Sequence, residues 1–375
     1  MAKLLFISNI SDSVGSFAVA SIAAAKKCGL EFYYASNWSA ATDEQMKADE
    51  KKFGIKLFHM DLERSPYSTK NIKAYKQLVD FIKEEKIDYI HCNTPVGGIL
   101  GRLAGEKCKV KRIVYEAHGF HFYDGAPKKN WMIYYPIEKW LAKKTDAIIT
   151  INNEDFERAK TFKLKNNGRV YYVPGVGIDL SQYEINENMR KIKRNELSLK
   201  ETDKMVISVG ELNTNKNNKV ILKAMAEMKK NNVHYFMCGV GTLEEDLKSL
   251  AKSYGIENQV HFLGYRNDIK DLLQATDIFV MPSIREGLSR SLMEAMACGA
   301  PCIVSNIRGN SDLINNNVNG FLCSNIGDYV QSLKMLLESK ECAEKFSKKS
   351  LEIVKGFSLE TVINYIYSIY SKELA

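Results

Sequence analysis

Short apolar runs recur along the whole chain, and most are separated by segments whose apolar positions follow helical spacing. In the first half, the runs that predict strands are Leu4–Ser8, Phe32–Ala35, Lys56–His59, Tyr89–Cys92, Ile113–Ala117, Ala147–Ile151 and Val170–Val173. In the second half, they are Val206–Val209, His234–Cys238, Val260–Leu263, Ile278–Met281, Cys302–Val304 and Phe321–Cys323. Strands that alternate with helices form parallel sheets with right-handed crossovers. We therefore predict an α/β fold with two doubly wound domains facing across a cleft.

One stretch, Asp277–Asn310, combines strand, turn, helix and strand in a short space. Its first strand ends at Met281, a polar turn follows, and a helix is predicted over Leu288–Cys298. In open α/β sheets, ligands bind beyond the carboxyl ends of the strands. The turn between this strand and this helix is therefore a candidate binding site.

Glu286 lies in that turn and Glu294 lies in the helix. Between them are the first backbone N–H groups of the helix, which have no partner within the helix and attract an anion. Because a carboxylate can accept hydrogen bonds from two vicinal hydroxyls, the layout suits a nucleotide sugar with its diphosphate at the helix start. A structural interpretation also fits, since Ser291 and Glu294 match a capping box and Arg290 and Glu294 an i,i+4 ion pair.

The residues from Arg285 to Pro301 read REGLSRSLMEAMACGAP. This run resembles the E-x7-E signature of retaining glycosyltransferases of the GT-B fold, and more narrowly the family-4 enzymes of capsule and exopolysaccharide assembly. The resemblance covers most of the chain and is strongest over 113–160 and 260–312. It implies two Rossmann-like domains, with Glu286 as a catalytic residue facing the donor sugar and Glu294 bound to the ribose.

The same resemblance implies further donor contacts. The backbone amides of Gly287, Leu288 and Ser289 would donate hydrogen bonds to the diphosphate, and Lys216 would form an ion pair with it. Gly239, in a G-x-G turn, would let the nucleotide approach the backbone, and the backbone near Tyr265 would meet the nucleobase. We also predict donor contacts at Gly15 and Gly210, and, independently of the resemblance, at Arg266 and Arg290.

Glu211 departs from the family pattern, which has an arginine there and a lysine a few residues further on. A carboxylate beside a diphosphate repels it. We therefore expect another cation, Arg290 or Arg266, to supply the missing charge.

The segment Glu116–Tyr123 places two histidines and several aromatic residues directly after a predicted strand. Its letters HGFHFY resemble the family and imply a catalytic role for His118 beside the donor sugar and an acceptor contact for His121. Thr94 begins the helix after the fourth strand, either as a plain helix start or as an acceptor contact. Gly15 is either a turn glycine or a position where a ligand approaches the backbone.

The polar stretch Ser181–Asp203 separates the two series of strands. We predict an acceptor-binding domain over 1–178, a linker over 179–203 and a nucleotide-sugar-binding domain over 204–357. In the GT-B fold the last helix usually crosses back onto the first domain, so residues 358–375 are expected to pack there.

The net charge of +8 lies entirely in residues 1–178, where 28 Lys and Arg face 20 Asp and Glu. This asymmetry favours an acidic partner such as a membrane surface, a lipid-linked phosphate or a nucleic acid, or it reflects a solvated lysine-rich surface. Lys128–Lys144 mixes tryptophan, tyrosine and lysine and is the best candidate for contact with the inner face of the plasma membrane. A helix packed on the sheet with a solvated lysine face fits this segment slightly better.

No apolar run approaches the roughly 20 residues that span a membrane, and the first residues read as a strand rather than a signal peptide. The eight cysteines are scattered without a C-x-x-C pair, which is typical of a reducing compartment and gives no metal site. We therefore expect a cytoplasmic enzyme that needs no metal or cofactor and associates peripherally with the membrane.

From these features we predict a retaining glycosyltransferase that moves a hexosyl group from a nucleotide sugar, with UDP-sugars favoured, to a hydroxyl of a lipid-linked oligosaccharide. Two alternatives stay open. One is a sugar-nucleotide 2-epimerase of the same fold, and the other is a non-catalytic nucleotide-sugar-binding subunit, which only Glu211 supports. No nucleic-acid-binding module is recognisable, so no nucleic acid is expected as a partner.

Overall fold

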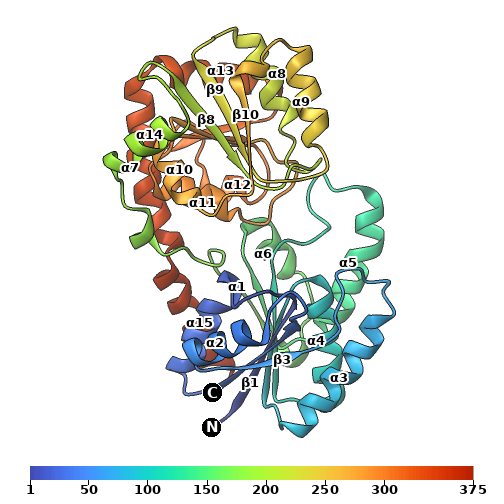
Figure 1. Cartoon of the computed structure of the whole chain (residues 1–375). Coiled ribbons are helices and arrows are strands. Elements are labelled where there is room, and N and C mark those ends of the chain that lie inside the picture. The colour runs from blue at the N-terminus through green and yellow to red at the C-terminus, as the bar shows by residue number, and fades with distance from the viewer. Residues whose placement is uncertain (375) are drawn as a thin grey trace. The chain divides into compact units, whose positions relative to one another are not determined.

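The computed structural model describes residues 1–374, which form two compact units (Figure 1). The first unit comprises Met1–Gly177 together with the C-terminal segment that begins at Leu359. The second unit comprises Ile178–Ser358. Each unit is built on its own parallel β-sheet with helices on both faces.

The sheet of the first unit has seven strands in the order β3-β2-β1-β4-β5-β6-β7. The strands are β1 (Lys3–Ile10), β2 (Glu31–Asn37), β3 (Lys56–His59), β4 (Tyr89–Asn93), β5 (Arg112–Ala117), β6 (Ala147–Thr150) and β7 (Arg169–Tyr172). The helices are α1 (Ser16–Lys27), α2 (Asp43–Phe53), α3 (Lys70–Glu84), α4 (Pro95–Cys108), α5 (Lys128–Ala142), α6 (Asn153–Ala159) and α15 (Leu359–Glu373).

The sheet of the second unit has six strands in the order β10-β9-β8-β11-β12-β13. The strands are β8 (Lys204–Val209), β9 (Val233–Cys238), β10 (Val260–Gly264), β11 (Ile278–Met281), β12 (Cys302–Ser305) and β13 (Gly320–Cys323). The helices are α7 (Glu187–Glu196), α8 (Lys219–Met228), α9 (Glu244–Ser253), α10 (Ile269–Ala275), α11 (Arg290–Ala297), α12 (Asn310–Leu313), α13 (Ile326–Glu338) and α14 (Lys340–Ile353). Every predicted strand overlaps an observed one, and the predicted α/β architecture of two Rossmann-like halves is confirmed.

Strand β1 shows why the short apolar runs become buried strands. Leu5 and Ile7 belong to the hydrophobic core on one face of the sheet, whereas Leu4 and Phe6 belong to the core on the other face. Successive side chains of a strand point to opposite faces, so an uninterrupted apolar run requires cover on both faces. Helices provide that cover.

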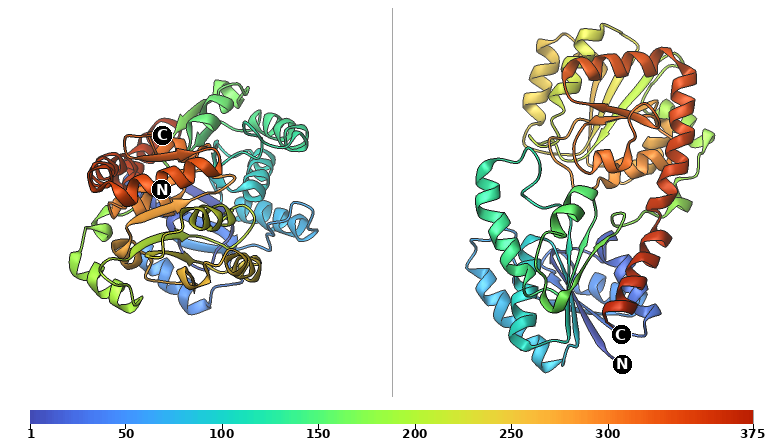
Figure 2. Two further views of the ribbon diagram at one scale, coloured as in Figure 1. Left: turned by 90° about the horizontal axis from the view of Figure 1, so that it is seen from above. Right: turned by 180° about the vertical axis from the view of Figure 1, so that it is seen from behind.

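The C-terminal helix α15 supplies part of the cover over this sheet, because it lies against α1 in the first unit (Figure 2). Val362, Ile366 and Ile369 recur at helical spacing and are buried in the same core as Leu4 and Phe6. The last residues of the chain thus complete the fold of the first unit.

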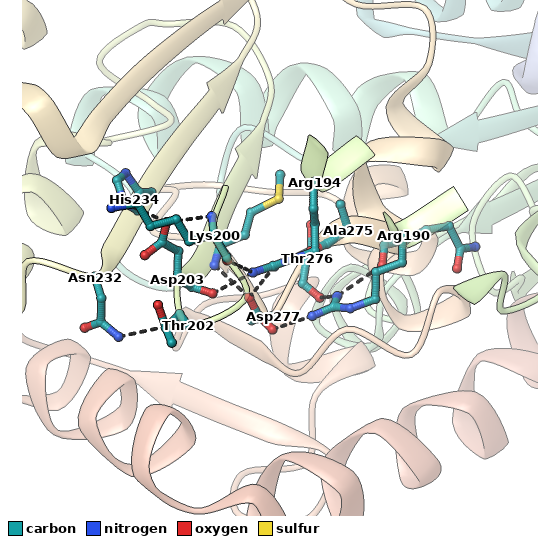
Figure 3. A network of polar contacts seen from close by, with 12 residues as sticks. Arg190, Arg194, Lys200, Thr202, Asp203, Asn232, His234, Ala275, Thr276 and Asp277 are labelled. Carbon is teal, nitrogen blue, oxygen red and sulfur yellow. Dashed lines mark hydrogen bonds and ion pairs between the residues drawn. The ribbon is translucent and has the colours of Figure 1, made fainter. Parts of the chain in front are cut away.

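The segment 179–203, assigned to a linker from the sequence, contains the helix α7 and lies in the second unit. Two arginines of α7 bind Asp277 at the start of β11 (Figure 3). Arg190 Nη2 lies 2.6 Å from one carboxylate oxygen, and Arg194 Nη1 lies 3.0 Å from the other. The backbone N–H of Met205 donates to the same carboxylate at 2.7 Å. These contacts fix α7 to two strands of the sheet.

The strand order reverses between β1 and β4 in the first sheet and between β8 and β11 in the second. At such a switch point neighbouring connections leave toward opposite faces of the sheet, which opens a ligand-binding crevice beyond the strand ends. The loops after β8 and β11 carry Lys216 and Glu286, and the loops after β1 and β4 carry Gly15 and Thr94. The topology therefore brings predicted site residues to both switch points.

Candidate active site

Lys216 and Glu286 meet at the switch point of the second unit. The loop after β8 and the turn after β11 lie side by side, and Lys216 Nζ is 2.7 Å from Glu286 Oε1. Both side chains are largely buried, with 22% of Lys216 and 14% of Glu286 exposed. A small pocket next to Lys216 is lined by Gly210, Met281 and Pro282 among others. The residue expected to bind a phosphate and the residue expected to bind a sugar thus share one site.

Glu294 is held by two partners one turn further along α11. The Tyr183 hydroxyl donates to Glu294 Oε1 at 2.8 Å, and Arg290 Nε donates to the same oxygen at 2.8 Å. Burial and the nearby Glu294 carboxylate raise the pKa of Tyr183, so the hydroxyl keeps its proton and acts as the donor. The sequence analysis did not single out Tyr183, because it lies 111 residues away in the chain.

The helix start differs from the capping box that the sequence suggested. Ser289 is the N-cap of α11, and its hydroxyl accepts a hydrogen bond from the Leu292 N–H at 3.4 Å. Glu294 therefore lies inside the helix and does not cap it. The i,i+4 ion pair between Arg290 and Glu294 is present.

The two arginines expected to replace the cation missing at position 211 are both in ion pairs. Arg290 pairs with Glu294. Arg266 lies 2.6 Å from Asp268 and 2.7 Å from Glu196, and these two contacts raise its pKa further. The Glu211 side chain is exposed. Each arginine would have to exchange a carboxylate for a phosphate in order to fill the role.

Arg308 is a second cation that contacts the turn containing Glu286. It follows β12, it is 8% exposed, and its Nε donates to the backbone carbonyl of Glu286 at 3.3 Å. This contact between the Arg308 side chain and the main chain helps to hold the turn in its conformation.

The glycines after β8 and β9 allow two loops to touch. The backbone N–H of Gly239 donates to the carbonyl of Gly264 at 2.8 Å, and that of Gly210 donates to Cys238 at 2.9 Å. Gly239 has φ = +146°, and a Cβ there would lie 2.0 Å from the Gly210 carbonyl oxygen. Only glycine fits at position 239. Tyr265, next in the chain after Gly264, is 77% exposed.

The turn before α11 is packed just as closely. A Cβ at Gly309 would lie 2.4 Å from the carbonyl oxygen of Gly287, so the loop after β12 supports this turn from behind. Leu288 packs against the core of the second unit. Gly287, Leu288 and Ser289 thus occupy a defined conformation directly before the first turn of α11.

His118 lies at the end of β5 in the first unit. Its ring packs edge-on against Phe17 of α1, with ring centroids 4.8 Å apart. His118 Nε2 lies 3.6 Å from Glu116 Oε1, and 15% of the side chain is exposed. Burial lowers the pKa of His118, although the Glu116 carboxylate opposes this shift. The imidazole is therefore neutral at neutral pH.

The other three predicted site residues of the first unit differ in their local surroundings. The Thr94 hydroxyl donates to Asn9 at 2.7 Å, and Thr94 has φ = +63°, which is unusual for a β-branched residue. Gly15 is the N-cap of α1 with an ordinary extended backbone, and a Cβ at this position would meet no atom within 4 Å. His121 packs against Tyr134 of α5 with ring centroids 4.7 Å apart.

Two sequence models match this chain. The model "Glycosyl transferases group 1" matches residues 189–352, and the model "Glycosyl transferase 4-like" matches residues 39–152. Among curated relatives, a putative glycosyltransferase EpsD of Bacillus subtilis is 33% identical over 377 residues, covering 98% of this chain and 96% of that protein. A UDP-Gal:α-D-GlcNAc-diphosphoundecaprenol α-1,3-galactosyltransferase of Escherichia coli is 31% identical over 308 residues, covering 80% of this chain and 79% of that protein.

Solved structures of the same fold include Anabaena HepE in complex with UDP-glucose. It superposes with a TM-score of 0.80 at 19% identity and covers 99% of this chain and 100% of that one. WaaG, a glycosyltransferase involved in lipopolysaccharide biosynthesis, superposes with a TM-score of 0.73 at 18% identity, covering 98% and 99% of the two chains. At these identities the likeness shows the fold alone.

Two Rossmann-like units and the Glu286–Glu294 turn on the second of them define a glycosyltransferase of the GT-B fold. With a relative one-third identical over nearly its whole length, the chain belongs to the family-4 type of glycosyltransferases that includes EpsD. The prediction of an enzyme of this family is confirmed, and the transferase is favoured over the epimerase and the non-catalytic subunit.

None of the helices in residues 1–374 is both long and apolar enough to cross a membrane. No group of three or more His, Cys, Asp or Glu side chains in the same range is arranged to hold a metal ion.

Proposed function

We propose that this enzyme transfers a hexosyl group from a UDP-sugar, with retention of anomeric configuration, to a hydroxyl of a lipid-linked saccharide in polysaccharide assembly. The observation that carries the proposal is the contact between Lys216 and Glu286 at the switch point of the second unit. Two relatives support the donor and the acceptor, since the E. coli enzyme is named for UDP-galactose and for a diphosphoundecaprenol-linked sugar. A Campylobacter jejuni relative is likewise named for a diphospho-undecaprenol substrate.

The donor diphosphate is proposed to lie against Lys216 and the amides of Gly287, Leu288 and Ser289. A lysine and the start of a helix both stabilise the negative charge that develops on a leaving diphosphate. Glu286 is the proposed ligand of the sugar hydroxyls, and Glu294 that of the ribose. Gly239 and the chain at Tyr265 complete the nucleotide side, where a backbone without side chains allows close approach.

In the proposed reaction the bond between the anomeric carbon and the diphosphate breaks and a bond to the acceptor oxygen forms on the same face. The acceptor proton passes to the departing phosphate oxygen. Glu286 orients the sugar and does not become covalently attached. In the first unit, His118 is the proposed residue at the reaction centre, with His121 and Thr94 on the acceptor side.

The first experiment is a thermal-shift screen of the full chain with UDP-, GDP- and dTDP-sugars. A ligand that binds only the folded protein raises the melting temperature by mass action. A UDP-sugar is expected to stabilise the wild type and to lose that effect in Glu294→Ala. Stabilisation by a GDP- or dTDP-sugar instead would overturn the proposed base.

The second experiment tests transfer. The stabilising donor is incubated with a synthetic polyprenyl diphosphate-linked N-acetylglucosamine, and the product is analysed by NMR for its anomeric configuration. An α-linked product from an α-configured donor is expected. An inverted product would exclude the retaining mechanism, and a 2-epimerised sugar nucleotide formed without acceptor would favour the epimerase.

For the membrane side, we propose that α5 docks on an anionic lipid surface. Its outward face exposes Met132 (77%), Ile133 (46%), Ile137 (39%) and Trp140 (49%). Lysines flank this apolar stripe, at Lys128, Lys129, Lys139 and Lys143. Apolar side chains rimmed by lysines are the composition of helices that lie in the plane of a membrane surface.

The inward face of α5 is firmly packed on the first unit, so the two interpretations of this helix from sequence are compatible. Leu141 is fully buried, and Glu138 accepts two hydrogen bonds from the buried Arg102 at 2.8 and 2.9 Å. The lysine face is therefore fixed in position relative to the sheet. A rigid amphipathic helix would present its apolar stripe to a bilayer without an ordering cost.

Vesicle co-sedimentation tests this contact. The wild type should bind vesicles containing phosphatidylglycerol and be released by salt, and Met132→Ser with Trp140→Ser should lose most of the binding. Ile72→Ser on α3, which is 62% exposed, is the matched control and should bind as the wild type does. Equal binding by all three proteins would exclude α5 as the docking surface.

A further inference from the structure

A series of buried polar side chains leads through the sheet of the first unit to His118. The Tyr370 hydroxyl of α15 lies 2.6 Å from His91 Nδ1. His91 Nε2 lies 3.1 Å from Glu116 Oε2, and Glu116 Oε1 lies 3.6 Å from His118 Nε2. The four residues come from α15, β4, β5 and the end of β5, and 279 positions separate Tyr370 from His91.

Three members of this series of side chains are almost completely buried. The His91 side chain is 0% exposed, that of Glu116 is 6% exposed and Tyr370 is 1% exposed. A buried carboxylate is costly unless it is paired and hydrogen-bonded. Apart from His91 and Asn93, the buried residues of the two strands have apolar or aromatic side chains, and a carboxylate at position 116 therefore calls for an explanation beyond packing.

The charge state of Glu116 follows from its two neighbours. Burial alone would raise the pKa of Glu116, but His118 and His91 outweigh burial and lower it. Glu116 is thus a carboxylate, with two oxygens that can only accept hydrogen bonds. The carboxylate attracts an N–H and repels a lone pair, so it favours the proton on each histidine nitrogen that faces it, at 3.1 Å in His91 and at 3.6 Å in His118.

This preference of the carboxylate assigns a proton position to each of the two histidines. His91 Nε2 carries a proton toward Glu116, so its Nδ1 has the lone pair that accepts from the Tyr370 hydroxyl. His118 Nε2 faces the carboxylate at 3.6 Å, beyond hydrogen-bonding distance, so the charge of Glu116 favours the proton on this nitrogen without a direct hydrogen bond. The lone pair of His118 is then on Nδ1, and neither ring nitrogen of His118 has a hydrogen-bond partner among residues 1–374.

We propose that Glu116 is a positioning residue that holds His118 as the Nε2–H tautomer, and that Tyr370 acts on His118 through His91 and Glu116. His118 Nδ1 is thereby the nitrogen offered to a hydroxyl of the donor sugar or the acceptor. This inference rests on the proposed role of His118. It gives the C-terminal helix α15 a part in preparing the site as well as in completing the fold.

Histidine-selective ¹⁵N labelling of the full chain tests the tautomers without donor or acceptor. Long-range ¹H–¹⁵N spectra at pH 7.5 distinguish the two neutral tautomers of each of the six histidines, and His118→Gln assigns the relevant signal. The wild type should show His118 and His91 as Nε2–H. Glu116→Gln should shift His118 to a mixture of tautomers, because an amide can donate as well as accept.

Tyr370→Phe is the second variant, since it removes only one hydroxyl and keeps the ring in the core. It should move the His91 signal strongly and the His118 signal weakly in the same direction as Glu116→Gln. Glu116→Asp, which keeps the carboxylate, should retain the wild-type tautomer. An Nδ1–H tautomer of His118 in the wild type, or an unchanged His118 signal in Glu116→Gln, would overturn the proposal.

The transfer assay supplies the functional readout. Glu116→Gln should lower kcat by about tenfold or more while the KM for the donor stays within twofold, as for other supporting residues behind a reactive group. Glu116→Asp should recover most of the rate. A wild-type chain that shows the predicted tautomers but transfers no sugar would refute the proposed function of His118 while leaving the tautomer assignment in place.

Discussion

Lys216 Nζ and Glu286 Oε1 lie 2.7 Å apart, so the two residues proposed to bind the donor form an ion pair with each other. In this pair a largely buried ammonium and a largely buried carboxylate compensate each other's charge. A diphosphate would compete with Glu286 for Lys216 and leave Glu286 for the sugar hydroxyls. The ion pair thus couples the two halves of donor recognition.

This coupling predicts opposite effects for the two residues. Lys216→Ala should weaken UDP binding by about tenfold or more, the equivalent of one lost hydrogen bond to a charged group. Glu286→Gln should leave UDP binding unchanged or tighter, because Lys216 is released, and should reduce transfer by at least about a hundredfold. Isothermal titration with UDP and a rate assay separate these effects.

Lys219→Ala is the matched control for the lysine, because Lys219 is exposed three residues further along the same loop and helix start. It should bind UDP as the wild type does. Equal loss of UDP binding in Lys216→Ala and Lys219→Ala would point to general electrostatic attraction. Unchanged binding in Lys216→Ala would remove Lys216 from the phosphate site.

Tyr183→Phe should affect the ribose side of the site alone. The substitution removes the hydroxyl that donates to Glu294 at 2.8 Å, and the remaining partner Arg290 would draw the carboxylate to the helix surface. We expect about a tenfold weaker affinity for UDP, from one lost hydrogen bond to a charged acceptor. Binding of inorganic diphosphate should not change, and a parallel loss of diphosphate binding would contradict this assignment.

Asp277 is predicted to be a stability residue of the second unit. Asp277→Asn leaves Arg190 and Arg194 without their carboxylate while the fold still holds them near the sheet. The expected loss is about 2–3 kcal/mol, as for a charged hydrogen-bonded pair, which lowers the melting temperature by about 5–10 °C. Glu201→Gln, exposed in the same segment, should change the melting temperature little. A similar shift in both variants would indicate a general charge effect.

The sequence predicted the strands and the polar turns well because both depend on local patterns. Continuous apolar runs such as Leu4–Ser8 can only be buried strands or core helices, and their length decides between the two. The E-x7-E turn was also visible, because its glycine and its two glutamates lie in one short stretch. In these cases the structure repeats what neighbouring residues already imply.

The partners of those residues could not be predicted in the same way. Tyr183 reaches Glu294 across 111 positions, and Tyr370 reaches His91 across 279. No periodicity in one sequence relates residues so far apart. Arg266 was expected at the phosphates from its charge alone, but Asp268 and Glu196 hold it in ion pairs.

The pH dependence of stability should report on His118. Burial lowers its pKa below the usual 6.5, and the opposing Glu116 carboxylate does not restore it. A group with a lowered pKa in the folded state contributes stability above its ordinary pKa, and that stability is lost as the pH falls through the folded value. Glu116 behaves alike in a more acid range, because its pKa is also lowered.

Acid destabilisation of the wild type should therefore begin near pH 6.5 and deepen toward pH 4. In His118→Gln the first part of this loss should shrink, because one histidine no longer takes up a proton on unfolding. Melting temperatures measured by calorimetry at half-unit steps of pH would show the difference as a flatter curve between pH 6.5 and 5. His261, whose pKa is lowered by burial and by His234, contributes in the second unit, and His261→Gln measures that share separately. Identical curves for the wild type and His118→Gln would mean that the pKa of His118 is not lowered in the folded protein, so that the Glu116 carboxylate fully offsets the effect of burial.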